Sequence, residues 1–310
     1  MKVGIVGTGA VGSSAAYAMI MDGTVSELVL IDPNEGLASA QDEDLEDATL
    51  FANPVRISVG DYAGLSGAGV VAICCGARQV PGETRLQLLG RNTVIFKQIL
   101  RQIASHAPEA ILLVVSNPVD LLTELVCRLS GLPAGRVFGT GTLLDTARFR
   151  AHLGQAVGVS PQSIHGYVLG EHGDSEVLVW STVSVGGIPL DAFAKQVGHP
   201  LTPEFIARID DGVRNSAARI IQGKGSTCYG IGAAIAHIVR AVRDDERILL
   251  TVSAPSPELG DGGAPCLSLP RIVGSRGVIR TLFPTLSAGE RQALEASAHV
   301  LAEAHNGASK

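Results

Sequence analysis

The sequence lacks the patterns that mark several common classes of protein. It contains no CxxC pair and no HExxH segment, so neither a zinc site nor a local dithiol motif is indicated. It also has no internal repeat, no low-complexity tract and no long run of Lys or Arg. Because the formal net charge is −6, the chain has no electrostatic footprint for nucleic acid. We therefore expect neither a metal centre nor a nucleic-acid partner.

Cysteine is scarce and odd in number, which does not suit a disulfide framework. The 310 residues include five, namely Cys74, Cys75, Cys127, Cys228 and Cys266. Cys74 and Cys75 are adjacent within an apolar run, where we expect a buried strand rather than a bridge. A reducing, cytoplasmic setting is the simplest interpretation.

One uncharged stretch has the hydropathy of a signal peptide or a membrane helix. No charged residue occurs from position 3 to 21, directly after Lys2. Four glycines interrupt this run, however, and neither a leader nor a membrane helix is built on such spacing. We expect no membrane association.

With 46% hydrophobic and 17% charged residues, the chain is apolar enough for a well-filled core, and its length suggests two domains.

Short apolar runs alternate with helical patterns in the first part of the chain. Most of the runs are continuous rather than alternating, as expected for strands buried on both faces. They cover residues 2–6, 28–31, 56–59, 70–75, 111–116 and 136–140. Strands that alternate with helices indicate an α/β fold with a Rossmann-type, doubly wound parallel sheet. We assign this domain to residues 1–141.

The pattern changes after residue 141, where helical segments mix with strand-like runs. The runs cover residues 166–169, 177–180, 247–253 and 266–269. The last helical segment opens with Ser287 and Glu290, which form a capping-box pattern. We expect residues 142–310 to form a second, α+β domain that carries the substrate and the catalytic groups.

A glycine-rich turn directly follows the first strand and opens the first helix. It reads Gly7-Thr8-Gly9-Ala10-Val11-Gly12. Such glycines allow a tight turn and close approach to a pyrophosphate, which the helix N-terminus then stabilises. Asp32 ends the second strand, where a carboxylate accepts hydrogen bonds from ribose hydroxyls and repels a 2′-phosphate. We predict an NAD site with Gly7, Gly9, Val11, Gly12 and Asp32 among its residues.

Three polar islands lie far apart in the sequence. They cover residues 76–85 (GARQVPGETR), 145–148 (DTAR) and 170–174 (GEHGD). Together with residues 116–120 (SNPVD) and 224–227 (KGST), they resemble the L-lactate dehydrogenases of the lactate/malate dehydrogenase family over essentially the whole chain. The resemblance implies reversible hydride transfer between NADH and pyruvate to give L-lactate and NAD+, as in pyruvate fermentation after glycolysis.

The residue types in the islands suit the reduction of a 2-oxo acid, which needs a proton donor and a group that fixes a carboxylate. His172 is the natural proton carrier, because an imidazole ordinarily titrates near neutrality. Arg148 can hold the substrate carboxylate through two parallel hydrogen bonds. Arg85 can polarise the carbonyl and stabilise negative charge on its oxygen. The resemblance assigns Asp145 as the partner that orients the His172 imidazole.

The resemblance assigns further residues to the site. Asn117, at the end of the fifth strand, is expected near the substrate carbonyl and the nicotinamide. Thr227 is expected in the substrate wall, and Ile231 against the nicotinamide ring. An apolar side chain there favours the neutral, reduced ring over its cation.

Substrate choice depends on Gln79, which stands six residues before Arg85. In the family the residue at this position contacts the far end of the substrate. Related malate dehydrogenases carry Arg there, which forms an ion pair with the second carboxylate of their substrate. Gln79 is neutral, so oxaloacetate would bury a charge without a partner. The neighbouring Arg78 is out of register by one residue, and we expect it to point elsewhere. Pyruvate is therefore the predicted substrate.

The resemblance also implies regulation and assembly. Arg150 and His165 occupy the positions that form a fructose 1,6-bisphosphate site at a subunit interface in bacterial lactate dehydrogenases. Two copies that meet across a two-fold axis would repel each other until a bisphosphate neutralised them. A homotetramer is expected on resemblance alone.

Three alternatives stay open at this point. One is a malate or a broad 2-hydroxy acid dehydrogenase, which Gln79 disfavours. Another is a dinucleotide-binding protein without catalysis, which has no need of Arg85, Arg148, Asp145 and His172 together. A D-specific hydroxy acid dehydrogenase would place its nucleotide motif in mid-chain rather than at residue 7.

Overall fold

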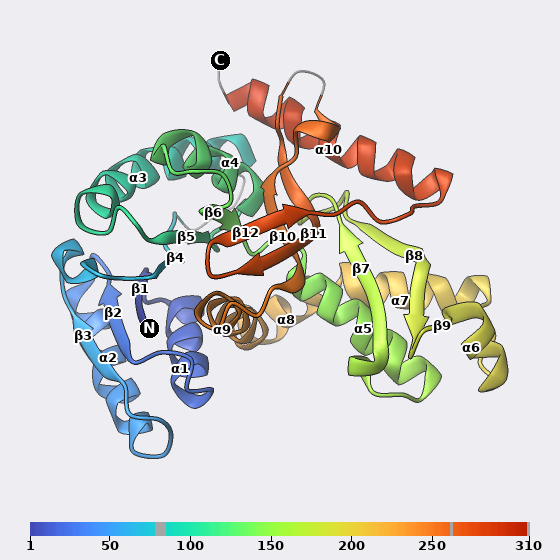
Figure 1. Ribbon diagram of the computed structural model, residues 1–310, viewed down its shortest axis with the longest axis horizontal. Helices are drawn as coiled ribbons and strands as arrows, with labels where there is room; N and C mark the ends of the chain where they lie inside the picture. The colour runs from blue at the N-terminus through green and yellow to red at the C-terminus, as the bar shows by residue number, and fades with distance from the viewer. Residues whose placement is uncertain (78–84, 261–262, 309–310) are drawn as a thin grey trace.

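The computed structural model of the protein describes residues 1–77, 85–260 and 263–308, with the backbone alone for residues 85–86 and 306–308. Its first part alternates strands and helices, as the apolar runs predict (Figure 1). The elements are β1 (Lys2–Val6), α1 (Ala10–Met21), β2 (Glu27–Ile31), α2 (Glu35–Thr49), β3 (Arg56–Val59), β4 (Val70–Ile73), α3 (Arg85–His106), β5 (Ile111–Val114), α4 (Val119–Ser130) and β6 (Val137–Gly139).

Six of these strands form a parallel sheet in the order β6-β5-β4-β1-β2-β3. The chain moves outward in one direction from β1 to β3 and in the other from β4 to β6. The direction therefore reverses between β1 and β4. In doubly wound sheets this reversal opens a crevice at the carboxyl ends of the strands, where ligands bind. The α/β, Rossmann-type fold predicted from the sequence is confirmed.

The second part of the chain contains helices and antiparallel strands. Its elements are α5 (Leu143–Val157), β7 (Ile164–Leu169), β8 (Val177–Val185), β9 (Ile188–Pro189), α6 (Leu190–Gln196), α7 (Pro203–Arg214), α8 (Ser216–Lys224), α9 (Tyr229–Arg243), β10 (Ile248–Pro255), β11 (Cys266–Gly274), β12 (Gly277–Thr281) and α10 (Ala288–Ala308). Strands β7, β8 and β9 form a small sheet of their own. Phe149 of α5 packs edge-on against Trp180 of β8, with 5.1 Å between the ring centroids.

Strands β10, β11 and β12 extend the large sheet beyond β6 as antiparallel strands, with Ser253 of β10 opposite Gly139 of β6. The sequence pattern finds β10 and β11 but groups them with the second part of the chain. A strand pattern indicates which residues of a segment are buried. It does not indicate which other strand forms backbone hydrogen bonds with that segment.

Helices cover both faces of the large sheet (Figure 1). One buried hydrophobic cluster joins the sheet to α3, α4 and α10, and a second joins the opposite face to α1 and α9. A third cluster holds α5, α6 and α7 against the small sheet. The predicted capping box is confirmed, since the Ser287 amide donates to Glu290 Oε2 at 2.8 Å and the Glu290 amide donates to Ser287 Oγ at 3.3 Å. Among the described residues, no helix is both long and apolar enough to cross a membrane.

Candidate active site

The carboxyl edge of the parallel sheet brings together segments that are remote in the sequence. Gly7 follows β1, Asp32 follows β2, Asn117 lies beyond β5, and Asp145 lies in the first turn of the helix after β6. The Gly7 amide donates to the Ile31 carbonyl at 2.7 Å, which ties the first turn to β2. Parallel strands end at the same edge, so these side chains share one side of the molecule.

The glycine-rich turn has the shape of a pyrophosphate cradle. Gly7 has a φ of +99°, and a Cβ there would lie 2.6 Å from the Cys75 nitrogen. A Cβ on Gly12 would collide with the Gly7 carbonyl oxygen. A Cβ on Gly9, by contrast, would meet no heavy atom of the described residues within 4 Å, its chain neighbours aside, and Gly9 begins α1 without a side-chain cap. The helix N-terminus is thus open to an anion, and the residues fit a dinucleotide diphosphate.

Asp32 is held beside this turn. Its Oδ2 accepts a hydrogen bond from the Thr8 amide at 2.8 Å, and its Oδ1 accepts one from the Asn34 amide at 2.9 Å. A fixed carboxylate at the end of β2 suits a ribose with free hydroxyls and repels a phosphate ester. The turn and Asp32 together favour NAD over NADP.

His172 and Arg148 meet at one carboxylate, that of Asp145. The His172 Nδ1 lies 2.6 Å from Asp145 Oδ2, and Arg148 Nη1 donates to Asp145 Oδ1 at 2.8 Å. Asp145 is buried, whereas the His172 side chain is 29% exposed. With Nδ1 held by the carboxylate, Nε2 is the ring nitrogen left to exchange a proton with a substrate. An imidazole and a guanidinium therefore lie side by side with fixed orientations.

The surroundings favour the charged form of both partners. Burial alone would lower the pKa of His172, but the hydrogen bond and the charge of Asp145, assisted by Asp120 and Glu176, raise this pKa to about 9. Burial alone would raise the pKa of Asp145, yet His172 and Arg148 hold it below its ordinary value. The imidazolium–carboxylate pair is therefore the form that prevails at neutral pH.

Asp120 is a residue of this site that the sequence analysis did not assign. It is buried in the first turn of α4, and its Oδ2 accepts the backbone N–H of His172 at 2.7 Å. Burial raises the pKa of Asp120 to about 6, against the hydrogen bond from the His172 amide. The sequence holds a signal for it, namely an acidic residue among apolar ones at the start of a buried helix. The partner, 52 residues away, is visible only in the structure.

Glu176 is a second residue that the sequence analysis missed. It is buried close to the His172 cluster, and burial and the charge of Asp145 raise its pKa to about 7, although Arg214, His172 and Arg148 oppose the shift. No motif marks this position, because a glutamate shortly after an expected loop is ordinary in a sequence.

The other predicted residues lie beyond β5, near or on α9, and on α1, or their side chains are outside the described part of the chain. Asn117 is exposed, and its Oδ1 accepts the Val119 amide at 3.3 Å. Thr227 is half-buried just before α9, and Ile231 and Val11 pack against the same cluster where α9 meets α1. The side chains of Gln79, Arg78 and Arg85 lie outside the described residues.

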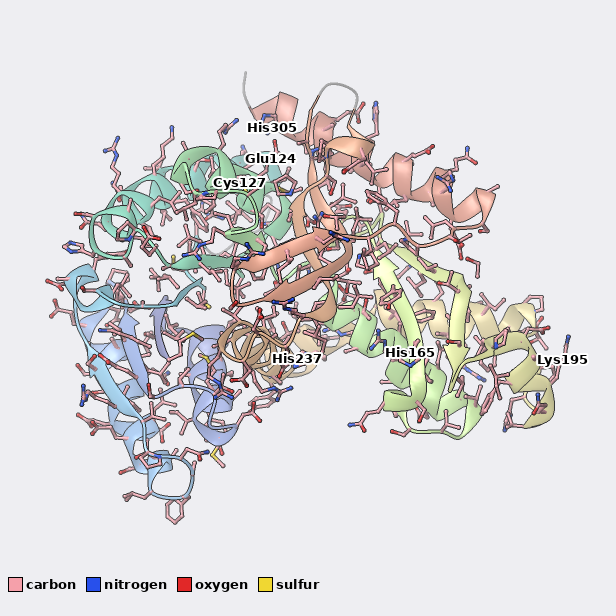
Figure 2. All side chains as sticks on the ribbon, in the orientation of Figure 1. Glu124, Cys127, His165, Lys195, His237 and His305 are labelled. Carbon is pink, nitrogen blue, oxygen red and sulfur yellow. The ribbon has the colours of Figure 1, made fainter. Side chains whose placement is uncertain are left out.

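Arg150 and His165 lie on the neighbouring elements α5 and β7. Arg150 Nε donates to the Gly166 carbonyl, the residue after His165, at 3.0 Å. The Arg150 guanidinium also lies 5.5 Å from the centroid of the Tyr167 ring. His165 is exposed on β7 (Figure 2). Arg150 and His165 therefore lie close together on neighbouring elements.

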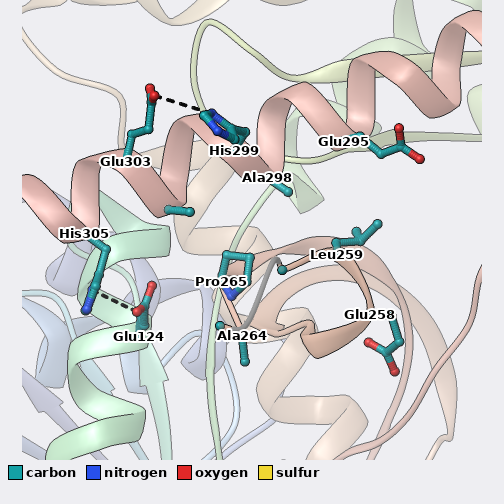
Figure 3. A pocket seen from close by; sticks show the side chains of 13 residues that line it. Glu124, Glu258, Leu259, Ala264, Pro265, Glu295, Ala298, His299, Glu303 and His305 are labelled. Atoms are coloured by element: carbon teal, nitrogen blue, oxygen red, sulfur yellow. Dashed lines mark ion pairs between the residues drawn. The ribbon is translucent and has the colours of Figure 1, made fainter.

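A separate cavity of about 580 Å³ lies between α10 and residues 258–260 and 263–265. Figure 3 shows that carboxylates and histidines line it, with Glu124 paired to His305 and Glu303 paired to His299. None of the predicted site residues lines this cavity. Four glutamates would repel an anionic substrate, so it is not the active site.

Asp145→Asn is expected to lower the pKa of His172 from about 9, because the charge that stabilises the imidazolium is lost while burial remains. An NMR titration of the imidazole measures the shift. Asp174→Asn removes an exposed carboxylate from the same loop and serves as the matched control. An unchanged His172 pKa in Asp145→Asn would show that Asp145 does not set the protonation of the ring.

A dinucleotide-binding sheet with a His–Asp pair at its carboxyl edge is the arrangement of an NAD-dependent dehydrogenase. Residues 1–139 match the description "lactate/malate dehydrogenase, NAD binding domain", and residues 142–310 match "lactate/malate dehydrogenase, alpha/beta C-terminal domain". The chain belongs to the lactate/malate dehydrogenase family.

Relatives at high identity agree with this assignment. An L-lactate dehydrogenase of Thermus aquaticus is 55% identical over 301 residues, and the match covers 97% of each chain. One of Allorhizobium ampelinum is 53% identical over 301 residues, again with 97% of each chain covered. The solved structure of a minor L-lactate dehydrogenase from Enterococcus mundtii is similar with a TM-score of 0.94 and 40% identity, and covers 98% of this chain and 97% of its own.

Proposed function

We propose that the protein is an L-lactate dehydrogenase, in which residues 1–141 bind NAD and residues 142–310 carry the substrate site. The observation that carries the proposal is the contact of His172 and Arg148 with one buried carboxylate, that of Asp145. A protein that only bound a dinucleotide would have no use for an imidazolium and a guanidinium that share one buried carboxylate. The names of the relatives support the choice of lactate and pyruvate.

When bound, NADH supplies the hydride that reduces the carbonyl carbon of pyruvate. Arg148 holds the substrate carboxylate and so aims the carbonyl at His172. The protonated His172 then donates from Nε2 to the carbonyl oxygen, and Asp145 stabilises the imidazolium before the transfer. Arg85 is assigned to polarise the carbonyl. Asn117, Thr227 and Ile231 are assigned to the walls of the substrate and nicotinamide sites.

The direct test follows NADH absorbance after pyruvate is added to the purified protein. Oxidation of NADH with formation of L-lactate supports the proposal. No turnover, with tight NADH binding, would favour the non-catalytic alternative.

Substrate preference follows from the neutral Gln79. We expect kcat/KM for pyruvate to exceed that for oxaloacetate by at least ~100-fold, a difference of roughly 2.7 kcal/mol, because oxaloacetate would bury an unpaired carboxylate. Gln79→Arg should raise activity on oxaloacetate, with Arg78→Gln as the neighbouring control. Equal rates of the wild type on both acids would instead indicate a malate or broad 2-hydroxy acid dehydrogenase.

The pair of Arg150 and His165 supports an effector site for fructose 1,6-bisphosphate between subunits of a homotetramer. Their proximity on α5 and β7 offers a guanidinium and an imidazole as donors to phosphate oxygens. The bisphosphate is expected to lower the KM for pyruvate and to shift the oligomer toward the tetramer, as measured by kinetics and by sedimentation. Arg150→Gln should abolish both effects. An unchanged KM and an unchanged oligomer would exclude the site.

The cysteines are few and odd in number, which supports a reducing, cytoplasmic setting for the protein.

A further inference from the structure

A cavity that the proposed reaction does not use lies between the C-terminal parts of α3 and α4, which pack against each other (Figure 1). Its volume is about 470 Å³. Pro108 and Leu112, in the turn before β5 and at the start of that strand, complete its wall. Pockets for small molecules commonly enclose about 300–1,000 Å³, so this one has room for a single small molecule.

The cavity is separate from the predicted dinucleotide site. Leu112 lies at the amino end of β5, whereas Gly7, Asp32 and Asn117 follow the carboxyl ends of their strands. The two places are therefore at opposite edges of the parallel sheet. A molecule in the cavity would not occupy the space that the NAD turn offers.

The floor of the cavity is apolar. Leu100, Ile103, Ala107 and Leu112 line it, and all four belong to the buried hydrophobic cluster between the sheet and α3, α4 and α10. Leu129 of α4 also lines the cavity and is 39% exposed. An apolar chain laid against Leu129 and this floor would remove hydrophobic surface from water, which favours binding.

Two cationic side chains line the same cavity from α3. Lys97 and Arg101 are four residues apart, so they lie on one face of the helix. Both are exposed, and in the described part of the chain neither side chain has an ion-pair or hydrogen-bond partner. No aspartate or glutamate among the described residues lines the cavity. In a chain with a formal net charge of −6, this is a local excess of positive charge.

We propose that this cavity binds a small organic anion with an apolar tail, of which the decanoate anion is an example. The tail lies against Leu100, Ile103 and Leu129, and the anionic head accepts hydrogen bonds from Lys97 and Arg101. Inorganic phosphate would leave the apolar floor unfilled, and an uncharged amphiphile would leave the two cations unpaired. A partner protein would bury about 800 Å² of this chain, far more than one enclosed cavity supplies.

The test titrates decanoate, below the concentration at which it forms micelles, into the full-length protein and measures the heat of binding. We expect saturable binding of one decanoate per chain. Saturating NADH should leave the affinity unchanged, because the cavity and the dinucleotide turn lie at opposite edges of the sheet. The uncharged 1-decanol has the same tail and should bind about 5-fold more weakly, since it forms no ion pair.

Filling the cavity should abolish binding. Ala104 lines the cavity and is exposed, so Ala104→Trp should place an indole in the cavity without disturbing the core. Ala293→Trp, at an exposed position of α10 that does not line the cavity, is the matched control and should bind decanoate as the wild type does. Both variants should oxidise NADH with pyruvate at the wild-type rate, which shows that they are folded.

Removing the two cations should weaken the binding of decanoate but not that of 1-decanol. We expect the double variant Lys97→Gln/Arg101→Gln to bind decanoate about 10-fold more weakly. The double variant Lys195→Gln/Arg219→Gln removes two exposed cations from α6 and α8 and should bind decanoate normally.

Several results would overturn the proposal. They are the absence of saturable binding, displacement of decanoate by NADH, and wild-type affinity in Ala104→Trp. Equal affinities for decanoate and 1-decanol would also overturn it, because the cavity would then not select an anion.

Discussion

His172→Asn is expected to lower kcat for pyruvate reduction by about 10²–10⁴-fold, because proton transfer to the carbonyl oxygen then falls to water. Asn preserves a polar side chain of similar reach but carries no transferable proton near neutrality. Stopped-flow measurement of NADH oxidation at saturating pyruvate gives kcat directly. The affinity for NADH, measured by fluorescence titration, should change little, since His172 is not part of the glycine-rich turn.

His199→Asn provides the control, because His199 is exposed and stands outside the site. It should retain wild-type kcat. If His172→Asn kept wild-type kcat as well, His172 would not be the proton donor, and the geometry around Asp145 would need another explanation.

Arg148→Leu is expected to lower kcat/KM for pyruvate by about 30- to 5000-fold, equivalent to about 2–5 kcal/mol. The substitution leaves the substrate carboxylate without its cationic partner and also removes the hydrogen bond to Asp145 Oδ1. Most of the loss should therefore appear as a higher KM, with a smaller fall in kcat as His172 and Asp145 relax.

Arg148→Lys distinguishes charge from geometry. Lysine keeps the charge but cannot form two parallel hydrogen bonds, so its activity should fall between those of the wild type and Arg148→Leu. Arg219→Lys, on the exposed surface of α8, is the matched control and should be neutral. Wild-type kinetics in Arg148→Lys would mean that the guanidinium fork is not used to grip the substrate.

The site could be anticipated from the sequence to different degrees. The dinucleotide turn was predictable because its glycines and Asp32 act through local backbone geometry at the ends of adjacent strands. The roles of His172, Arg148 and Asp145 came from residue chemistry together with family resemblance. Asp120 and Glu176 were missed because a buried carboxylate gains its role from neighbours that are distant in the sequence.

Sequence alone determined the local elements of this protein, including the strands, the turn at Gly7 and the capping box at Ser287, since periodicity and turn chemistry act over a few residues. Tertiary structure decided which of them meet. It joined β10, β11 and β12 to the large sheet and brought His172 and Arg148 to one carboxylate. The physical reason is that hydrogen-bond partners and electrostatic surroundings belong to the packed chain, whereas a hydrophobic pattern records only how each segment is buried.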